Sequence, residues 1–413
     1  MWFELIRDFL FDMKAHRTRA ILTLVAMMWG TTAVVLLLAF GEGLNTQLMN
    51  GFLNAGNRIM ILYAGETGKP FEGVPKGRKI HLVEEDADML KRAIPFIADV
   101  SPGYMGNVSL TYGKRTQSTT LEGVNPSFEE MRRMYPAAHG RFLNDLDVAQ
   151  ERRVLVLGSK IAKEVFGDDP PVGQSVLADG IPFTVVGIIQ DKIQTSMNNG
   201  PDSYRAIMPY TTYKSMYGPI YVNEIVVNPV DPSKQQEVKS EIFRVLSRKY
   251  HFDPTDDRTL FIWDFIEGEK MIKKVELGIS IFLGSIGFLT LLIAGVGVAN
   301  VMYVVVKERT HEIGVKMALG ARRSYILAQF IFEALSLAFI GGAIGILFSW
   351  LVVGFVHLFP SDEGVMQFLG RPSLSATIML LTSGILAGIG LIAGLFPARR
   401  AASVDPVESL RYE

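Results

Sequence analysis

Four long apolar runs alternate with polar segments along the chain. They cover residues 20–40, 277–306, 326–359 and 376–396. A helix needs about 20 apolar residues to cross the roughly 30 Å hydrocarbon core of a bilayer, so each run is long enough to span a membrane. The pattern therefore predicts four transmembrane helices.

The first run resembles either a cleaved signal peptide or a retained anchor. It is longer than the apolar part of a signal peptide, no small-residue cleavage site follows Phe40, and Glu42 comes almost at once. These features favour a retained helix. In front of it, residues 1–19 interleave apolar and charged side chains, which predicts an amphipathic helix in the membrane interface.

Basic residues near the ends of the runs predict the orientation of the chain. Short loops rich in Lys and Arg stay on the cytoplasmic side of a membrane. Residues 1–19 carry four such residues, 307–324 carry five and the C-terminal tail carries three, whereas 360–375 carries only Arg371. Both termini are therefore predicted to be cytoplasmic, and residues 41–275 to lie outside.

The composition supports a chain that is partly in and partly out of the bilayer. Hydrophobic residues make up 49% and the mean hydropathy is +0.25, yet 20% of residues are charged, which is too many for a purely membranous chain. The net charge of −1 and the lack of a basic and aromatic pattern give no case for nucleic acid. The absence of cysteine excludes disulfides and thiolate metal sites.

The outer segment has a mixed α and β pattern. Strand-like runs occur at 153–157, 183–189 and 224–228, and helical character occurs at 84–93, 126–134, 159–166 and 233–250. Asp179-Gly180 predicts a hairpin turn. Residues 64–78 and 191–203 are predicted loops whose role, connection or functional contact, the pattern leaves open.

Apolar stripes extend the first two spans outward from the membrane. They recur at helical spacing after the first span and before the second. Two such extensions predict a paired helical stalk between the membrane and the outer domain. The stripe residues are Leu44, Leu48, Phe52, Ala55, Ile262, Phe265, Ile266 and Ile272.

The polar segment 307–324 lies between two spans and has a helical pattern of its own. Ile313 and Met317 recur at helical spacing beside charged side chains, which predicts a short amphipathic helix, about Thr310–Leu319, on the cytoplasmic membrane surface. We expect it to dock into another protein through these two apolar residues, with Gly320 turning the loop back toward the membrane.

Small residues recur four apart within the spans and let helix backbones approach closely in lipid. They pack either inside one protomer or between protomers, and the sequence leaves both arrangements open. The residues are Ser280, Gly284, Gly341, Gly345, Gly384, Gly388, Gly390 and Gly394.

No pattern of catalytic or metal-ligating residues is present in the sequence. The six His residues are scattered, and neither a Gly-x-Ser-x-Gly elbow nor a G-x-x-x-x-G-K-[ST] phosphate cradle occurs. The acid placed well inside a predicted span is Glu333, for which snorkelling to the interface, a contact within the helix bundle and a role in coupling are all left open. The chain is therefore predicted to be non-catalytic by itself.

Three segments of the membrane part together resemble the FtsX-type permease domain of MacB-family ABC transporters. They are residues 308–323, 326–335 and 397–410. In the outer part, residues 123–128, 140–142, 154–158 and 183–187 resemble the external core domain of the same family. Together these resemblances cover nearly the whole chain.

The resemblance implies an α-helical membrane protein with four transmembrane helices and a large α+β extracytoplasmic domain inserted between the first and second. It divides the chain into an interfacial helix 1–19, a first span 20–40, a periplasmic core domain 41–275 with helical stalk ends, and an FtsX-like domain 276–413. It also implies a multi-pass protein of the bacterial inner membrane.

The implied function is that of a permease driven by ATP for export or extraction of substrate. Since the phosphate cradle is missing, ATP and Mg²⁺ are expected on a separate ABC ATPase subunit, with no cofactor on this chain. Other expected partners are the lipid bilayer, a second copy or closely related permease, and a periplasmic adaptor. The residues expected to couple to the ATPase are Glu308, Arg309, Glu312, Ile313, Lys316, Met317, Gly320, Ala321 and Arg322.

Two other functions are compatible with the same resemblance. One is a lipoprotein-releasing permease, and the other is an FtsX-like regulatory protein that activates a periplasmic cell-wall hydrolase without transporting anything. The large outer domain favours the transporter over the regulator.

Overall fold

The computed structural model describes residues 7, 9, 11, 13, 14, 17–195, 197, 199–359 and 370–403. Most of the predicted interfacial helix 1–19 and of the loop 360–375 lie outside these residues, as does the end of the C-terminal tail. The chain divides into two compact units. One comprises Met1–Gln47 with Lys274–Glu413, and the other is Leu48–Lys273. We call them the membrane unit and the outer unit.

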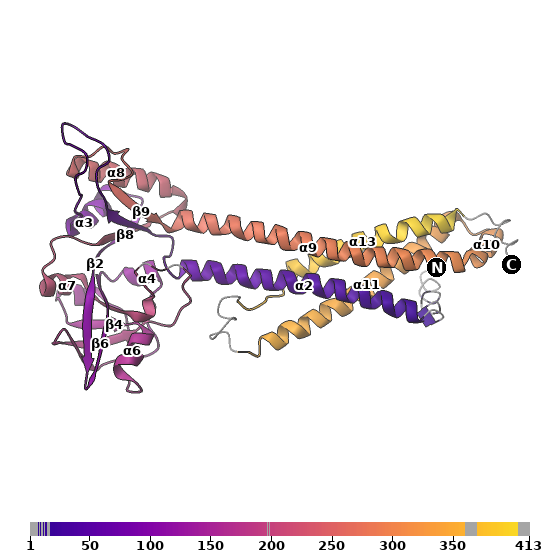
Figure 1. Cartoon of the computed structure of the whole chain (residues 1–413), viewed down its shortest axis with the longest axis horizontal. Coiled ribbons are helices and arrows are strands. Elements are labelled where there is room, and N and C mark those ends of the chain that lie inside the picture. Colours follow the sequence, from indigo (N-terminus) through magenta and orange to yellow (C-terminus); the bar gives the residue numbers. More distant parts are fainter. Residues whose placement is uncertain are drawn as a thin grey trace. The chain divides into compact units, whose positions relative to one another are not determined.

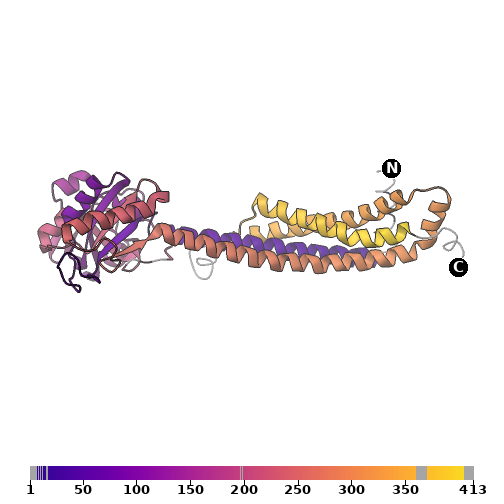
Figure 2. The ribbon, with the colours of Figure 1, turned by 90° about the horizontal axis from the view of Figure 1, so that it is seen from above.

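Four helices of the described residues are long and apolar enough to cross a membrane (Figure 2). The helices α2 and α9 extend beyond the predicted spans at their outer ends, as the apolar stripes indicated. The four helices are α2 (Arg17–Leu53), α9 (Phe265–Glu308), α11 (Arg323–Val356) and α13 (Ala376–Ala402).

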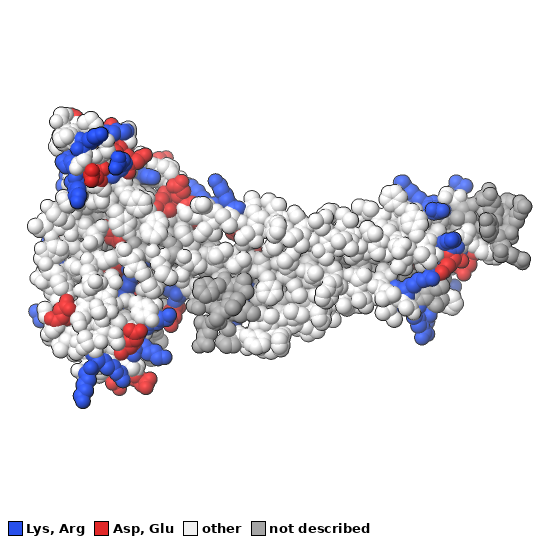
Figure 3. All heavy atoms as spheres, in the orientation of Figure 1, with Lys and Arg blue, Asp and Glu red and all other residues white. Residues whose placement is uncertain are grey.

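Large apolar side chains cover the outer faces of these helices because lipid, rather than water, is the surrounding solvent. Trp29, Phe282, Ile293 and Trp350 are each more than 60% exposed. Figure 3 shows an almost uncharged surface along the helices, with charged side chains gathered near α10 (Thr310–Ala318). The membrane unit is therefore built to be covered by lipid over most of its length.

Four of the predicted small residues pack inside the membrane unit. A Cβ atom added to Gly390 or Gly394 would lie 2.9 or 2.6 Å from the Cβ atoms of Ala338 and Ala334 on α11. In the same way, Gly341 and Gly345 of α11 lie against the backbone and side chains of α2. These glycines let three helices approach closely.

The other four predicted small residues are not packed against a neighbouring helix backbone in this way. A Cβ atom added to Gly284, Gly384 or Gly388 would meet no described heavy atom within 4 Å. Ser280 accepts a hydrogen bond from Asn45 Nδ2 of α2 at 3.4 Å. The small-residue pattern thus divides into an inner set and a set on open faces of α9 and α13.

The described part of the outer unit contains a nine-stranded sheet in the order β3-β7-β4-β6-β5-β2-β8-β1-β9. The long strand β2 pairs with β8 through residues 97–103, and with β3 through residues 104–112. The strands are β1 (Met60–Ala64), β2 (Ile97–Tyr112), β3 (Arg115–Val124), β4 (Val154–Leu157), β5 (Ser175–Ala178), β6 (Ile181–Ile188), β7 (Arg205–Pro209), β8 (Glu224–Pro229) and β9 (Leu260–Asp264).

Helices flank this sheet (Figure 1). Those at 84–93, 128–132, 159–166 and 235–250 lie within segments predicted to be helical, whereas those at 145–149 and 210–217 were not predicted. The hairpin turn at Asp179-Gly180 joins β5 to β6, and both residues have the positive φ that a tight type I′ turn requires, 48° and 83°. The helices are α3 (Glu84–Ala93), α4 (Phe128–Arg132), α5 (Asp145–Ala149), α6 (Ser159–Phe166), α7 (Tyr210–Tyr217) and α8 (Gln235–Tyr250), with short 3₁₀ turns η1 (Asp202–Tyr204) and η2 (Pro232–Lys234).

The outer ends of α2 and α9 pack together within this unit. The rings of Phe52 and Phe265 lie 5.3 Å apart, and both belong to a buried cluster that includes Phe128 and Met131 of α4. Arg58, just after α2, donates to the carboxylate of Glu269 on α9 at 2.8 Å. The predicted pairing of the two helix extensions is present in this unit.

Candidate coupling site at the loop between α9 and α11

The helix α10 is a short amphipathic helix that ends in a tight turn. Gly320 has a φ of +97°, and its N–H donates to Met317 O, while the N–H of Ala321 donates to Lys316 O. This pair of bonds is a Schellman motif, which favours glycine at the left-handed position because other residues are strained there. The turn predicted at Gly320 and Ala321 therefore has a local structural cause.

The apolar face of α10 packs against the membrane helices of the same chain. Ile313 is only 3% exposed and belongs to the same buried cluster as Val306, Ile326 and Phe330, and Met317 packs partly against it. We expected Ile313 to protrude into a partner protein. That expectation is wrong for this structure, because residues at the adjoining ends of α9 and α11 pack with Ile313 in a buried cluster.

A buried ion pair joins the start of α10 to α11. Arg309, at the N-cap of α10, is 8% exposed, and its Nη1 donates to Glu333 Oε1 at 3.2 Å. Its Nε also donates to Glu312 Oε2 at 3.2 Å, and Gln329 Nε2 donates to Glu333 Oε1 at 3.2 Å. Of the roles left open for Glu333, the structure shows the contact within the bundle.

Arg309 was predicted as part of the ATPase-facing set, and the structure corrects its position. The guanidinium points into the chain and lies over the Phe330 ring at 5.5 Å. Near it, Lys316 Nζ lies 3.5 Å from Gln329 Oε1. These polar contacts fix α10 to α11 from the inside, and buried charged pairs of this kind specify one arrangement of the elements that carry them.

A second ion pair joins the inner ends of α2 and α9. Arg19 Nη1 lies 2.7 Å from both carboxylate oxygens of Glu308, at a surface where the two side chains are 43% and 38% exposed. Since the pair is exposed, it contributes little to stability. It does place Glu308 beside α2, so this member of the predicted coupling set has a partner within the chain.

The exposed face of α10 differs from the predicted one. Glu312 is 64% exposed at its side chain, Arg322 is exposed, and Leu319 is 85% exposed. Sequence reasoning missed Leu319 because it falls outside the i, i+4 stripe of Ile313 and Met317. Leu319 is therefore an exposed apolar side chain at the C-terminal end of α10, between Glu312 and Arg322 in the sequence.

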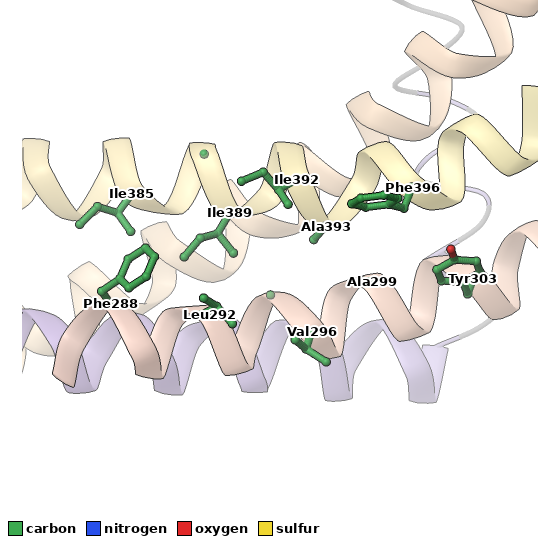
Figure 4. Close-up of a pocket in the computed structure, with 12 residues that line it drawn as sticks. Phe288, Leu292, Val296, Ala299, Tyr303, Ile385, Ile389, Ile392, Ala393 and Phe396 are labelled. Carbon is green, nitrogen blue, oxygen red and sulfur yellow. The ribbon is translucent and has the colours of Figure 1, made fainter. Parts of the chain in front are cut away.

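An apolar groove lies between α9 and α13 in the membrane unit, with a volume of about 570 Å³. Figure 4 shows Phe288 and Leu292 of α9 on one side, with Ile385 and Ile389 of α13 on the other. Gly388, one of the open small residues, also lines it. The groove can accept an apolar helix face or lipid chains, but it offers no charged group to bind a polar ligand.

The part of the chain that the structure describes holds no group of three His, Asp or Glu side chains that could bind a metal ion.

Comparison with known families identifies the architecture. The family described as the MacB-like periplasmic core domain matches residues 20–245, more than half of the chain, and the FtsX-like permease C-terminal family matches residues 284–406. The chain belongs to the MacB family of permeases. Within this family the four apolar helices and the α+β domain between the first two are the expected architecture, and the chain is a multi-pass membrane protein.

Relatives of this MacB-family chain are named for export. The macrolide export ATP-binding/permease protein MacB of Bdellovibrio bacteriovorus is 29% identical over 97% of this chain. The pyoverdine export ATP-binding/permease protein PvdT of Pseudomonas entomophila is 31% identical over 97% of it. The chain spans about 60% of the length of these relatives, 60% and 58% respectively.

A solved structure of the periplasmic region of MacB from Actinobacillus actinomycetemcomitans also matches. It covers 53% of this chain and 94% of its own, with 21% identity and a TM-score of 0.43.

Proposed function

We propose that this chain is the permease subunit of a MacB-type transporter that uses ATP to export or extract a substrate. A separate ATPase subunit would hold ATP and Mg²⁺, and this chain would carry no cofactor. The observation that carries the proposal is the construction of α10. Its inner face is fixed to the membrane helices by Ile313 and the Arg309–Glu333 pair, while Glu312 and Leu319 remain exposed.

This arrangement suits the transmission of force. A displacement applied to α10 from the cytoplasm reaches α11 through the Arg309–Glu333 pair and α9 through the chain itself, since α9 ends at Glu308 and α10 begins at Thr310. The helix α9 begins directly after β9 of the outer sheet. We therefore propose that ATP binding moves the outer domain through α9, with α2 as its partner.

We also propose that two permease subunits associate in the membrane, either as a homodimer or with a closely related chain. The open glycines Gly284, Gly384 and Gly388 and the apolar groove lie on α9 and α13, where close helix approach is possible. A periplasmic adaptor is a further proposed partner. The substrates printed in the names of the relatives, a macrolide and pyoverdine, are the first cargoes to test.

The proposal is tested by capturing the ATPase with the affinity-tagged full chain. Replacing Leu319→Asp should reduce the captured ABC ATPase at least tenfold, because docking at this face would then bury an unpaired charge. Leu358→Asp is the matched control, since Leu358 is 79% exposed beyond the other end of α11. Unchanged capture by the Leu319 variant would contradict docking at this face.

Transport distinguishes the alternatives. In cells, loss of the chain should raise sensitivity to a macrolide or retain pyoverdine, and the Leu319→Asp variant should not restore export. An FtsX-like regulator would instead leave both unaffected and change cell-wall hydrolysis. A lipoprotein-releasing permease would leave lipoproteins in the inner membrane.

A further inference from the structure

Segment 190–195, which includes the first part of the predicted loop 191–203 whose role remained open, binds the outer end of α2. The N–H of Thr195 donates to Gly51 O at 3.1 Å, and Asn54 Nδ2 donates to Ile193 O at 3.1 Å. A Cβ atom on Gly51 would lie 2.6 Å from the Thr195 side chain, so the loop lies directly on the helix. We call segment 190–195 the strap.

Lys192 is the central residue of the strap. Its Nζ donates to Asn54 O at 2.8 Å, just after the last residue of α2. The same Nζ also donates to the carbonyls of Arg132 and Arg133, at the end of α4. The last carbonyls of a helix lack intrahelical partners and carry the negative end of the helix dipole, so one ammonium group stabilises two helix ends at once.

A buried charge cluster holds Lys192 in place. Lys192 Nζ lies 2.7 Å from Asp202 Oδ2, and Asp202 Oδ1 accepts a hydrogen bond from Arg132 Nη2 at 3.1 Å. Gln194 of the strap makes two hydrogen bonds of 2.9 Å with Asp202. Asp202 is 1% exposed and Arg132 is 0% exposed, so the cluster lies in the interior of the outer unit.

The cluster continues into the sheet. Arg205 of β7 lies 3.4 Å from Asp202 and forms an ion pair with Glu122 of β3. The end of α2 is therefore bonded, through Lys192 and Asp202, to two strands of the outer sheet. Since a buried charge that loses its partner is costly, the separation of this end from the domain is resisted by the whole cluster.

We propose that the strap, centred on Lys192, is the joint that fastens the outer end of the first membrane helix to the outer domain and passes its displacement to the sheet. The transmission part rests on the proposed transport function, whereas the fastening does not. Coupling would enter through α9 by direct chain connection and through α2 by this joint.

The fastening is tested without any ATPase. The chain contains no cysteine, so spin labels placed at Asn50→Cys and Glu164→Cys, two exposed positions on α2 and α6, report the distance between helix end and domain without background. In the full chain in lipid nanodiscs, Lys192→Met should broaden this distance distribution. It should also speed hydrogen exchange at residues 48–56 at least tenfold while exchange in β4 and β6 stays unchanged.

Lys214→Met is the matched control, because Lys214 pairs with Glu84 at 2.8 Å on the surface of the same unit and is 47% exposed. An unchanged distance distribution in Lys192→Met would overturn the joint, whatever the chain transports. If Lys192→Met does not fold, the Asn54→Ala variant tests the joint instead. It removes the hydrogen bond from Asn54 to Ile193 of the strap and leaves the charge cluster complete. It should broaden the distribution to a smaller extent, and no broadening would overturn the proposal.

A transport assay then distinguishes the fastening of α2 from the transmission of its displacement. With the partner ATPase present, Lys192→Met should lower the substrate moved per ATP hydrolysed, with ATPase capture unchanged. A loosened joint with normal transport per ATP would refute transmission through the strap and leave the fastening intact.

Discussion

Arg309 Nη1 donates to Glu333 Oε1 at 3.2 Å, between a loop residue that precedes α10 and a carboxylate two to three turns inside α11. Both side chains are less than 10% exposed. A carboxylate at this depth is costly in an apolar surrounding, and the guanidinium offsets that cost. The pair therefore sets where α10 sits against the membrane helices.

A double-mutant cycle should measure this relationship. Arg309→Met and Glu333→Leu should each destabilise the chain, and the double variant should lose less than the sum, with a coupling of about 1–3 kcal/mol. Thermal unfolding in detergent measures it. The exposed Arg19–Glu308 pair is the control and should show a coupling below about 1 kcal/mol. Equal coupling in both pairs would contradict the importance of burial.

The two classes of small residue should respond oppositely to one added methyl group. Gly394→Ala places a Cβ atom 2.6 Å from the Cβ atom of Ala334 and should cost about 1–3 kcal/mol through overpacking. Gly384→Ala meets no described atom within 4 Å and should stabilise α13 by up to about 1 kcal/mol through helix propensity. Thermal unfolding of the isolated chain decides this prediction, which fails if both changes have the same sign.

Larger changes at the open glycines Gly384 and Gly388 probe self-association. If two copies meet at the open faces, a bulkier Gly384→Leu change should weaken the dimer in lipid nanodiscs without lowering the unfolding temperature of the monomer. Mass photometry at falling protein concentration measures the dimer. If the dimer persists in the Gly384→Leu, Gly388→Leu double variant, the two copies associate through another surface.

Lys192 should make the stability of the outer unit depend on pH. Burial lowers the pKa of Lys192 from its ordinary 10.5 to about 8, although Asp202 acts in the opposite direction. Between about pH 8 and 10.5 the Lys192 amine is protonated in the unfolded chain but not in the folded chain. The free energy of unfolding therefore rises with pH in that window. The contribution is on the order of 3 kcal/mol.

The measurement compares the unmodified chain with Lys192→Met in urea, with the fluorescence of Trp263 reporting on β9. The difference in unfolding free energy between the two should change in favour of the unmodified chain from pH 8 to 10.5, and should be nearly constant from pH 6 to 7.5. A difference that stays flat across the whole range would show that the ammonium is not buried as described.

The orientation predicted from basic residues is tested with reporters. A periplasmic reporter inserted near residue 150 should be active, and a cytoplasmic reporter fused after Glu413 should be active, since the Lys- and Arg-rich segments 307–324 and 397–413 remain inside. Finding both positions on one side of the membrane would require an even number of spans between them, instead of the three helices α9, α11 and α13.

Much of the fold could be predicted because its causes are local. The apolar runs predicted all four long helices, the stripes at Leu48 and Phe265 predicted their extensions, and Asp179-Gly180 predicted its hairpin. Sheet order could not be predicted, because β2 pairs with β8 and β5 through contacts between residues far apart in the sequence.

The helix α10 was predicted, but its buried and exposed faces were not. Spacing identified α10 and its apolar stripe, but spacing alone does not show whether a stripe faces a partner or the chain's own helices. Ile313 faces the chain's own helices, and the exposed Leu319 was missed. The strap could not be predicted from the sequence, because Lys192 donates a hydrogen bond to Asn54, which lies 138 positions earlier in the chain.

The pairing of α2 with α9 has a consequence for how the protein is made. Residues 54–264 separate the two helices. At about 5–20 residues per second, roughly 10–40 seconds pass between the synthesis of one and of the other. During this interval Asn45 of α2 has no Ser280 to bind, and the faces that later hold α9 and α11 contact lipid or the insertion machinery. The membrane unit is therefore completed last, when the C-terminal helices join a helix that has waited in the bilayer while the outer domain was translated.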